Sequence, residues 1–337
     1  YPRTPVVIRG ATIHSMVGQP QVGDVLIGED GLIEAVGSVN VPQGAEVVDA
    51  RGKHLYPGLI DPATTLGLTE IGQVPVSDDT SERGDFNARL AAGIAVNPDS
   101  ETIRVARAAG VLTAVSMPTG GTISGMAALL SLDGYTWEDL SYTNSFALVV
   151  NVGASERVLE RLDEWFAEAR AYIERRAAAE RGETSAVPRN RNLEVVHAAL
   201  SGEIPLLVTV STPTVVEAVT VWAAERGVSI LLVGGPELVR VADLLAKTRT
   251  PVAISGTTGV PSGDGPYDDD YTVPARLREA GVKFCFTTRD AHNVRWLRDL
   301  AGFAAAWGLW PEDAERAVTL WPAELLGLGS RLGAITP

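Results

Sequence analysis

The first fifty residues alternate apolar and polar positions, a pattern that is typical of short β-strands. Glu29, Asp30 and Gly31 form a polar turn between two of the apolar runs. A period of two with Asp-Gly between the runs predicts antiparallel hairpins. We therefore expect residues 1–54 to form a small β appendage, one part of a β-sandwich. The predicted strands cover residues 6–16, 24–27, 32–36 and 45–48.

From residue 55 onward, short apolar runs are separated by segments with helical periodicity, as in parallel strands joined by crossover helices. The predicted strands cover residues 55–60, 111–117, 146–152, 205–210, 228–233, 251–255 and 282–287. One helix is predicted to begin near residue 99, and further helices are predicted over residues 155–181, 212–226, 236–247 and 273–280. About seven or eight strands suffice to close a barrel. The fold class is therefore α/β, a TIM-like (β/α)8 barrel over residues 55–330. Residues 331–337 are expected to start a return to the β appendage, whose C-terminal part is absent.

Charge and cysteine content exclude several classes of function. The 337 residues include 42 acidic and 28 basic side chains, a formal net charge of −14. This balance repels a phosphate backbone, so nucleic acid is not an expected partner. No apolar run approaches the roughly 20 residues of a membrane span. The single cysteine, Cys285, lies in an apolar run, so we expect a buried thiol and neither an intrachain disulfide nor a cysteine-rich zinc site.

Residues 52–61, with the sequence GKHLYPGLID, resemble the start of the barrel in the amidohydrolase superfamily, especially its imidazolonepropionase-like branch. Blocks that resemble the same branch follow at residues 67–72, 97–101, 120–125, 233–235 and 290–295. The resemblance covers most of the chain and implies the amidohydrolase barrel. It also implies a His-x-His pair at the end of the first barrel strand, where both imidazoles reach a catalytic metal. Exported members of this branch suggest a periplasmic or secreted location, and a cytoplasmic one stays open.

The positions that hold metal ligands in this family carry other residues here. Ala63 and Thr65 stand at the His-x-His pair, Thr209 stands at a later histidine, and Arg289 stands at the aspartate that ends the last strand. A methyl group has no lone pair, and a neutral hydroxyl is a weak zinc ligand. A guanidinium adds a permanent positive charge that repels a cation. We therefore expect no metal site and no cofactor, with zinc required only if the chain is a working hydrolase.

Some polar residues remain on the face where barrel enzymes place their sites. Glu70, Asp290 and His292 could form a metal-free acid and base group. Alternatively, His292 and its neighbours cap and begin the next helix. Gly120 and Gly121 could offer backbone amides to a carboxylate or a peptide carbonyl, or could form only a tight turn. The candidate substrate-binding residues are Thr65, Gly120, Gly121, Ser124, Thr209, Arg289 and Arg295.

The remaining histidines, His14, His54 and His197, are predicted to be surface or packing residues because they lie away from the strand ends.

Three hypotheses for the function follow. The first is an amidohydrolase homologue without the usual metal ligands that acts as a binding or assembly subunit. Such a subunit would form a homo- or hetero-oligomer, with a metal-competent amidohydrolase paralogue as a candidate partner, and a small molecule or peptide as ligand. The second is a hydrolase of amide, peptide-like or cyclic C–N bonds with an atypical or metal-free site. The third is a purely structural scaffold.

Overall fold

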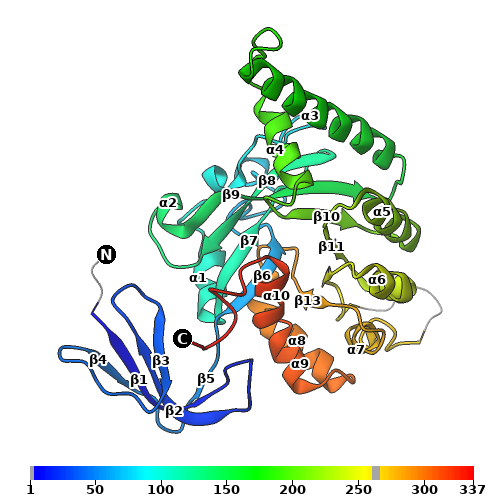
Figure 1. The fold of residues 1–337 in the computed structure, drawn as a ribbon. Coiled ribbons are helices and arrows are strands. Elements are labelled where there is room, and N and C mark those ends of the chain that lie inside the picture. The colour runs from blue at the N-terminus through cyan, green and yellow to red at the C-terminus, as the bar shows by residue number, and fades with distance from the viewer. Residues whose placement is uncertain (1–3, 260–265) are drawn as a thin grey trace.

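The computed structural model describes residues 4–259 and 266–337 and contains two β-sheets (Figure 1). The smaller sheet has the strand order β3-β2-β1-β4, and β5 also pairs with β1. Its strands are β1 (Val6–Ile13), β2 (Gln21–Ile27), β3 (Ile33–Gly37), β4 (Glu46–Asp49) and β5 (His54–Leu55).

The predicted hairpins are confirmed for the first three strands, since β1 pairs with β2 and β2 pairs with β3 in antiparallel fashion. The prediction was wrong for β4, which pairs with β1 in parallel. Residues 38–45 form a connection that is long enough to pass β2 and place β4 on the far side of β1.

The small sheet has its own apolar core. Its apolar core contains Ala11, Ile13 and Val25, and Ile335 from the C-terminal segment joins that core. The backbone N–H of Ile335 donates to the carbonyl oxygen of Ser15 at 3.2 Å. The C-terminal segment therefore lies against the small sheet, which forms a single layer within the described residues.

The larger sheet has eight strands in the order β13-β12-β11-β10-β9-β8-β7-β6, and β13 also contacts β6. The predicted α/β fold with a barrel-like sheet is thus confirmed. The strands are β6 (Leu59–Thr64), β7 (Val111–Ser116), β8 (Ile123–Ser131), β9 (Ser141–Gly153), β10 (Leu206–Val210), β11 (Leu231–Gly234), β12 (Val252–Ile254) and β13 (Phe284–Phe286).

One barrel strand departs from the (β/α)8 pattern. β8 runs antiparallel to both β7 and β9, whereas the other neighbouring pairs are parallel. Residues 117–122, which join β7 to β8, are too few for a crossover helix, which needs about 10 to 12 residues. The expectation of an all-parallel barrel was therefore wrong at this strand.

The first predicted barrel strand, residues 55–60, is divided between the two sheets. Leu55 belongs to β5 and pairs with Ile13 of β1, whereas Leu59 and Ile60 begin β6. Pro57 has no backbone N–H to donate to a strand neighbour, so the run is interrupted there.

The helices between and after the strands pack on the outside of the barrel, except α10, which contributes to its interior. They are α1 (Glu101–Ala108), α2 (Trp137–Leu140), α3 (Val158–Glu180), α4 (Arg191–Leu200), α5 (Pro213–Arg226), α6 (Ala242–Thr248), α7 (Val273–Glu279), α8 (Leu297–Ala306), α9 (Pro311–Arg316) and α10 (Leu320–Leu325). Four short 3₁₀ helices are η1 (Pro75–Ser77), η2 (Ala92–Ala95), η3 (Pro236–Val241) and η4 (Asn293–Trp296). The predicted helix 236–247 is split into η3 and α6, because Val241 leaves helical geometry with φ −121° and ψ 23°. Of the helices in the described residues, none is both long and apolar enough to cross a membrane.

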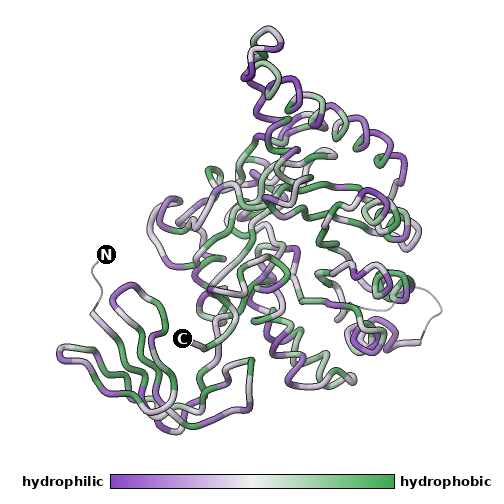
Figure 2. The backbone as a smooth tube through the Cα atoms, viewed as in Figure 1, coloured by the Kyte–Doolittle hydropathy of each residue, from purple (hydrophilic) through white to green (hydrophobic). Residues whose placement is uncertain are grey.

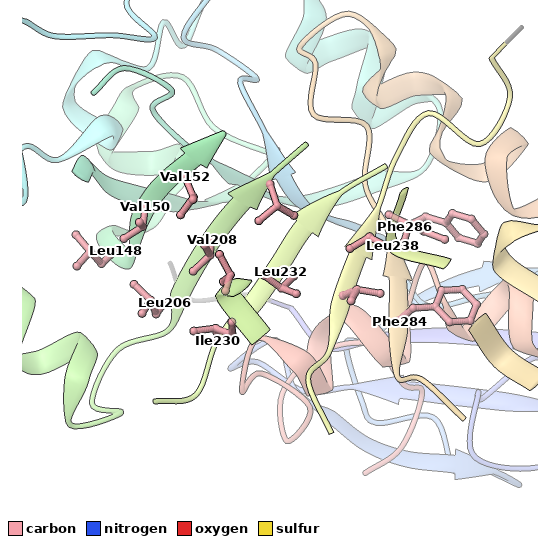
Figure 3. Close-up of a cluster of buried hydrophobic side chains, with 14 of the residues drawn as sticks. Leu148, Val150, Val152, Leu206, Val208, Ile230, Leu232, Leu238, Phe284 and Phe286 are labelled. Atoms are coloured by element: carbon pink, nitrogen blue, oxygen red, sulfur yellow. The ribbon is translucent and has the colours of Figure 1, made fainter. Parts of the chain in front are cut away.

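Strand side chains alternate between two apolar cores. Those that face the helices include Leu148, Val150, Leu206, Val208, Leu232, Phe284 and Phe286 (Figure 3). The alternate residues Val149, Leu207, Leu231 and Cys285 fill the barrel interior with Ala323 and Leu326 from the α10 region. Hydrophobic residues accordingly follow the barrel strands, whereas the exposed turns of α3 are hydrophilic (Figure 2). The interior is a packed core, so the carboxyl ends of the strands remain as the place for a site.

Candidate functional site

The barrel closes at a seam between β13 and β6, where backbone from elsewhere in the chain completes the hydrogen bonding. Phe286 N–H donates to the Ala317 carbonyl at 3.0 Å, and Ile60 N–H donates to the Val318 carbonyl at 2.9 Å. Residues 317–318 therefore bridge the seam partway along its length.

At the carboxyl end of the seam, the buried side chain of Asp61 holds the two edges together. Its carboxylate accepts hydrogen bonds from the Thr287 hydroxyl at 2.7 Å, from the Thr288 backbone N–H at 3.2 Å and from the Thr288 hydroxyl. It also accepts the Ala63 backbone N–H at 3.2 Å. Asp61 has an exposed fraction of 0%. Its oxygens are thus fully used in joining β6 to the residues that follow β13.

Burial dominates the electrostatics of this carboxyl. Loss of solvation raises the pKa of Asp61 from 3.8 to about 6, and the hydrogen bonds from Thr288, Thr287 and the backbone oppose part of that rise. Burial, with a smaller contribution from Asp61, also raises the pKa of the Cys285 thiol. Cys285 lies in the barrel interior, so the prediction of a buried thiol is confirmed.

Asp61 was not among the site residues predicted from the sequence. An acidic residue inside the apolar strand Leu59–Thr64 was the available signal, because a charged group in a buried strand needs partners. The partners lie 226 residues and more along the chain, so no local pattern pointed to them.

The positions expected for metal ligands surround the same end of the barrel. Ala63 is fully buried, and its carbonyl accepts the Arg289 N–H at 3.0 Å. Thr65 follows β6 and is nearly buried, and the Thr209 hydroxyl donates to Asn151 Oδ1 at 2.8 Å. Arg289 is exposed and adopts a left-handed backbone conformation with φ 56°.

This donor set does not fit a zinc ion. Within the described residues, His, Cys, Asp and Glu side chains form no group of three that could hold a metal. A methyl group, two alcohols and a guanidinium replace the imidazoles and carboxylate that zinc requires. Two acidic residues lie near these positions in the chain, Asp61 and Asp290. The Asp61 carboxylate already accepts from Thr287 and Thr288, and the Asp290 carboxylate accepts two backbone N–H groups.

The three acid and base candidates have local partners instead of one another. Asp290 Oδ1 accepts the backbone N–H groups of His292 and Asn293, each at 2.8 Å, and so caps η4. His292 is exposed at the start of η4. Glu70 Oε1 accepts the Asn97 side-chain amide at 3.4 Å. In residues 4–259 and 266–337, no hydrogen bond or ion pair joins Glu70, Asp290 and His292 to one another, and their catalytic role stays a prediction.

The glycine turn packs tightly against residues 80–86. A Cβ at Gly120 would come within 2.5 Å of the Ser81 Cβ, and one at Gly121 within 2.5 Å of the Gly84 carbonyl oxygen. Gly121 also has φ 69°, which disfavours any side chain. A side chain at either position would therefore clash with residues 80–86, which agrees with the interpretation of this segment as a tight turn.

Of two further candidates, Ser124 departs from its expected place and Arg295 lies in η4, at the helix start that was one of the predictions. Ser124 lies in β8 and not in the preceding loop, and its hydroxyl is buried with a long 3.5 Å contact to the Gly121 carbonyl. The Arg295 guanidinium stacks over the Trp296 ring at 5.4 Å from its centroid.

His14 and His54 have packing roles, as predicted. His14 Nε2 and His54 Nδ1 share a hydrogen bond of 2.9 Å, and the His14 ring stacks on Tyr56 at 4.1 Å between centroids. His14 Nδ1 also lies 3.9 Å from Glu315 of α9. This cluster joins the small sheet to the barrel.

Comparison with known proteins defines the class to which this architecture corresponds. An amidohydrolase from Thermotoga maritima MSB8 superimposes with a TM-score of 0.87 at 22% identity, over 98% of this chain and 91% of that one. Molinate hydrolase superimposes with a TM-score of 0.59 at 17% identity, over 100% of this chain and 88% of that one. No family model matches the chain.

Sequence similarity alone is more restricted. A dihydroorotase from Streptomyces coelicolor is 52% identical over 61 residues, which is 18% of this chain and 13% of that protein. The solved structures are similar over nearly the whole chain but at low identity. The chain therefore has the amidohydrolase fold, a barrel joined to a small β-sheet.

Proposed function

We propose that this chain is a ligand-binding or assembly protein of the imidazolonepropionase-like branch of amidohydrolases that does not carry out metal-assisted hydrolysis. The observation that carries the proposal is the set of side chains at the expected ligand positions, Ala63, Thr65, Thr209 and Arg289. The Ala63 carbonyl accepts the Arg289 N–H, so two of these positions are direct neighbours across the seam. A cation placed there would meet a guanidinium where hydrolases of this fold need a carboxylate.

The same residues suit a polar organic ligand. The exposed guanidinium of Arg289 has no ion-pair partner within the described part of the chain, and arginine matches the geometry of a carboxylate. Thr65 and the Thr209–Asn151 pair add neutral hydrogen-bonding groups. A small molecule or peptide with a carboxylate and an amide is the class of ligand that these groups would recognise.

Metal analysis of the purified protein tests this proposal. After incubation with excess zinc and gel filtration, we expect far less than one zinc per chain by plasma mass spectrometry. One tightly retained zinc per chain would overturn the proposal.

The second candidate is a hydrolase of amide, peptide-like or cyclic C–N bonds. It is favoured by the comparisons, because the similar proteins include a molinate hydrolase, an amidohydrolase and a dihydroorotase. In this chain such activity would use Glu70, Asp290 or His292 to activate water without a metal.

Assays of dipeptides, N-acyl amino acids and cyclic amides, with and without zinc, separate the two candidates. Activity that falls at least about 100-fold in Glu70→Gln or His292→Gln, but not in the surface control Arg298→Gln, would establish the hydrolase. Absence of turnover, with binding of the same compounds detected by calorimetry, would favour the binding protein.

The assembly part of the proposal concerns the small sheet. β3 and β4 are its edge strands, and Val47 and Val48 of β4 are exposed at 47% and 41%. An exposed edge strand offers unpaired backbone groups to a second chain. A second copy or a metal-competent paralogue would pair there, and light scattering after size-exclusion chromatography would reveal an oligomer.

A further inference from the structure

A groove of about 850 Å³ is lined by residues of α3 and of the start of α4. These two helices lie side by side, away from β6 and β13 at the barrel seam (Figure 1). Arg89, Arg175, Arg189 and Arg191 line the groove together with Tyr172. These arginines come from three parts of the chain: the segment before η2, the outer part of α3, and the residues around the start of α4. A convergence of this kind is created only by the tertiary fold.

One of the four lining arginines has an ion-pair partner, and within the described residues the other three have none. Arg189 pairs with Glu194 at 3.0 Å, and Glu194 also binds Arg176 at 2.6 Å, so that carboxylate is already neutralised. Within residues 4–259 and 266–337, Arg89, Arg175 and Arg191 have no carboxylate at ion-pair distance. Glu168 is the acidic residue in the lining, which leaves an excess of positive charge.

This excess stands out against the rest of the molecule. The chain has a formal net charge of −14, so a groove with four arginines reverses the overall sign. A concave surface of one sign concentrates counter-ions of the other sign.

The groove is also held in a defined shape. The Arg89 N–H donates to Asn192 Oδ1 at 2.9 Å, which fixes the Arg89 segment against the first turn of α4. The Asn190 N–H donates to the Tyr172 hydroxyl at 2.8 Å, which fixes the preceding loop against α3. Arg89, Arg175 and Arg191 therefore project from backbones that are tied to one another, and less ordering is needed on binding.

We propose that this groove binds a small ligand that carries at least two oxyanion groups, phosphate or carboxylate. Arginine recognises both groups through paired N–H donors in a fixed plane. The volume of about 850 Å³ falls in the range of small-molecule sites, roughly 300–1,000 Å³, and is larger than a single inorganic ion needs. The site is separate from the barrel mouth and does not depend on the function proposed there.

Calorimetric titration with pyrophosphate and with citrate tests the proposal and distinguishes the phosphate from the carboxylate source. We expect one site per chain for at least one of the two anions, with affinity that falls as salt rises. Arg175→Gln and Arg191→Gln should each weaken binding about tenfold, and the double variant about 100-fold. Arg298→Gln on α8 removes the same charge outside the groove and should bind as the unmodified protein does.

The result that would overturn the proposal is absence of saturable binding of both anions, or equal binding by the Arg175→Gln and Arg298→Gln proteins. Thermal unfolding midpoints of the variants show whether the fold is intact. Both arginines are exposed and have no ion-pair partner among the described residues, so the single variants are expected to fold. The single variants decide the outcome if the double variant does not fold.

Discussion

Asp61 and Thr288 lie on opposite sides of the barrel seam, and the Asp61 carboxylate accepts the Thr288 backbone N–H at 3.2 Å. The hydroxyls of Thr287 and Thr288 also donate to this carboxylate. The buried carboxyl therefore lies where the last barrel strand meets the first. A polar network thus joins the two edges of the barrel sheet at the end where the expected metal-ligand positions lie.

Replacement of Asp61 tests this network. Asp61→Ala leaves the backbone N–H groups of Thr288 and Ala63 without their side-chain acceptor and opens a buried space, so we expect the free energy of unfolding to fall by about 2–5 kcal/mol. Urea denaturation followed by circular dichroism measures the change. Asp99→Ala, at a carboxylate that is 88% exposed, is the control and should shift stability by less than about 0.5 kcal/mol. Equal effects of the two substitutions would contradict the role assigned to Asp61.

The buried carboxyl of Asp61 should make the free energy of unfolding depend on pH. The pKa of Asp61 is raised from 3.8 to about 6, so between these values the folded protein binds more protons than the unfolded chain. The free energy of unfolding then falls as pH rises from about 4 to 6, by an amount on the order of 3 kcal/mol for this group.

Because other groups titrate in the same range, the comparison is with Asp61→Asn, which cannot ionise. The stability of the unmodified protein relative to Asp61→Asn should decrease from pH 4 to pH 6 and then level off. A difference that is constant with pH, or that rises, would rule out a buried carboxyl with a raised pKa.

Restoration of ligands at the barrel mouth tests the geometry of the seam. We expect Ala63→His/Thr65→His/Arg289→Asp to retain about one zinc per chain, since three donors would then converge. The left-handed φ of 56° at position 289 suits aspartate, which tolerates that region better than most residues. The control Ala63→Gln/Thr65→Gln/Arg289→Asn has similar bulk without strong ligands and should retain none. Equal zinc content in both variants would mean that these positions do not converge.

The packing of the glycine turn predicts a difference between two glycines with similar backbones. Gly121 and Gly182 have φ values of 69° and 76°, but a Cβ meets the Gly84 carbonyl at 2.5 Å only in the first case. Gly182→Ala should therefore cost about 1 kcal/mol from backbone strain alone. Gly121→Ala should cost at least about 2 kcal/mol, because strain and a backbone clash add. Chemical denaturation of both variants checks the order, and a smaller loss for Gly121→Ala would refute the close approach.

Much of the barrel could be predicted because the local periodicity of hydrophobic residues indicates its strands and helices. Residues 205–210 and 228–233 were predicted as strands, and the structure has β10 at Leu206–Val210 and β11 at Leu231–Gly234. β8 (Ile123–Ser131) was not predicted as a barrel strand. It follows β7 after a connection too short for a crossover helix, so it runs antiparallel, and the length of a connection affects strand direction more than composition does. The residues at the expected metal-ligand positions could be identified because residues 52–61 resemble the start of the amidohydrolase barrel. The hydrogen-bond partners around these positions could not be predicted.

The sequence by itself therefore determined the class of fold, the buried thiol of Cys285 and the chemical identity of the side chains at the barrel mouth, because periodicity and residue type are local properties. Only the tertiary structure decided that Asp61 joins Thr287 and Thr288, that Asp290 caps η4, and that Arg89 and Arg191 line one groove. Each of these relationships joins residues that are distant in the chain or depends on how a loop turns. The physical reason is that contacts across a closed barrel are set by how its strands and connections pack, and no run of neighbouring residues encodes them.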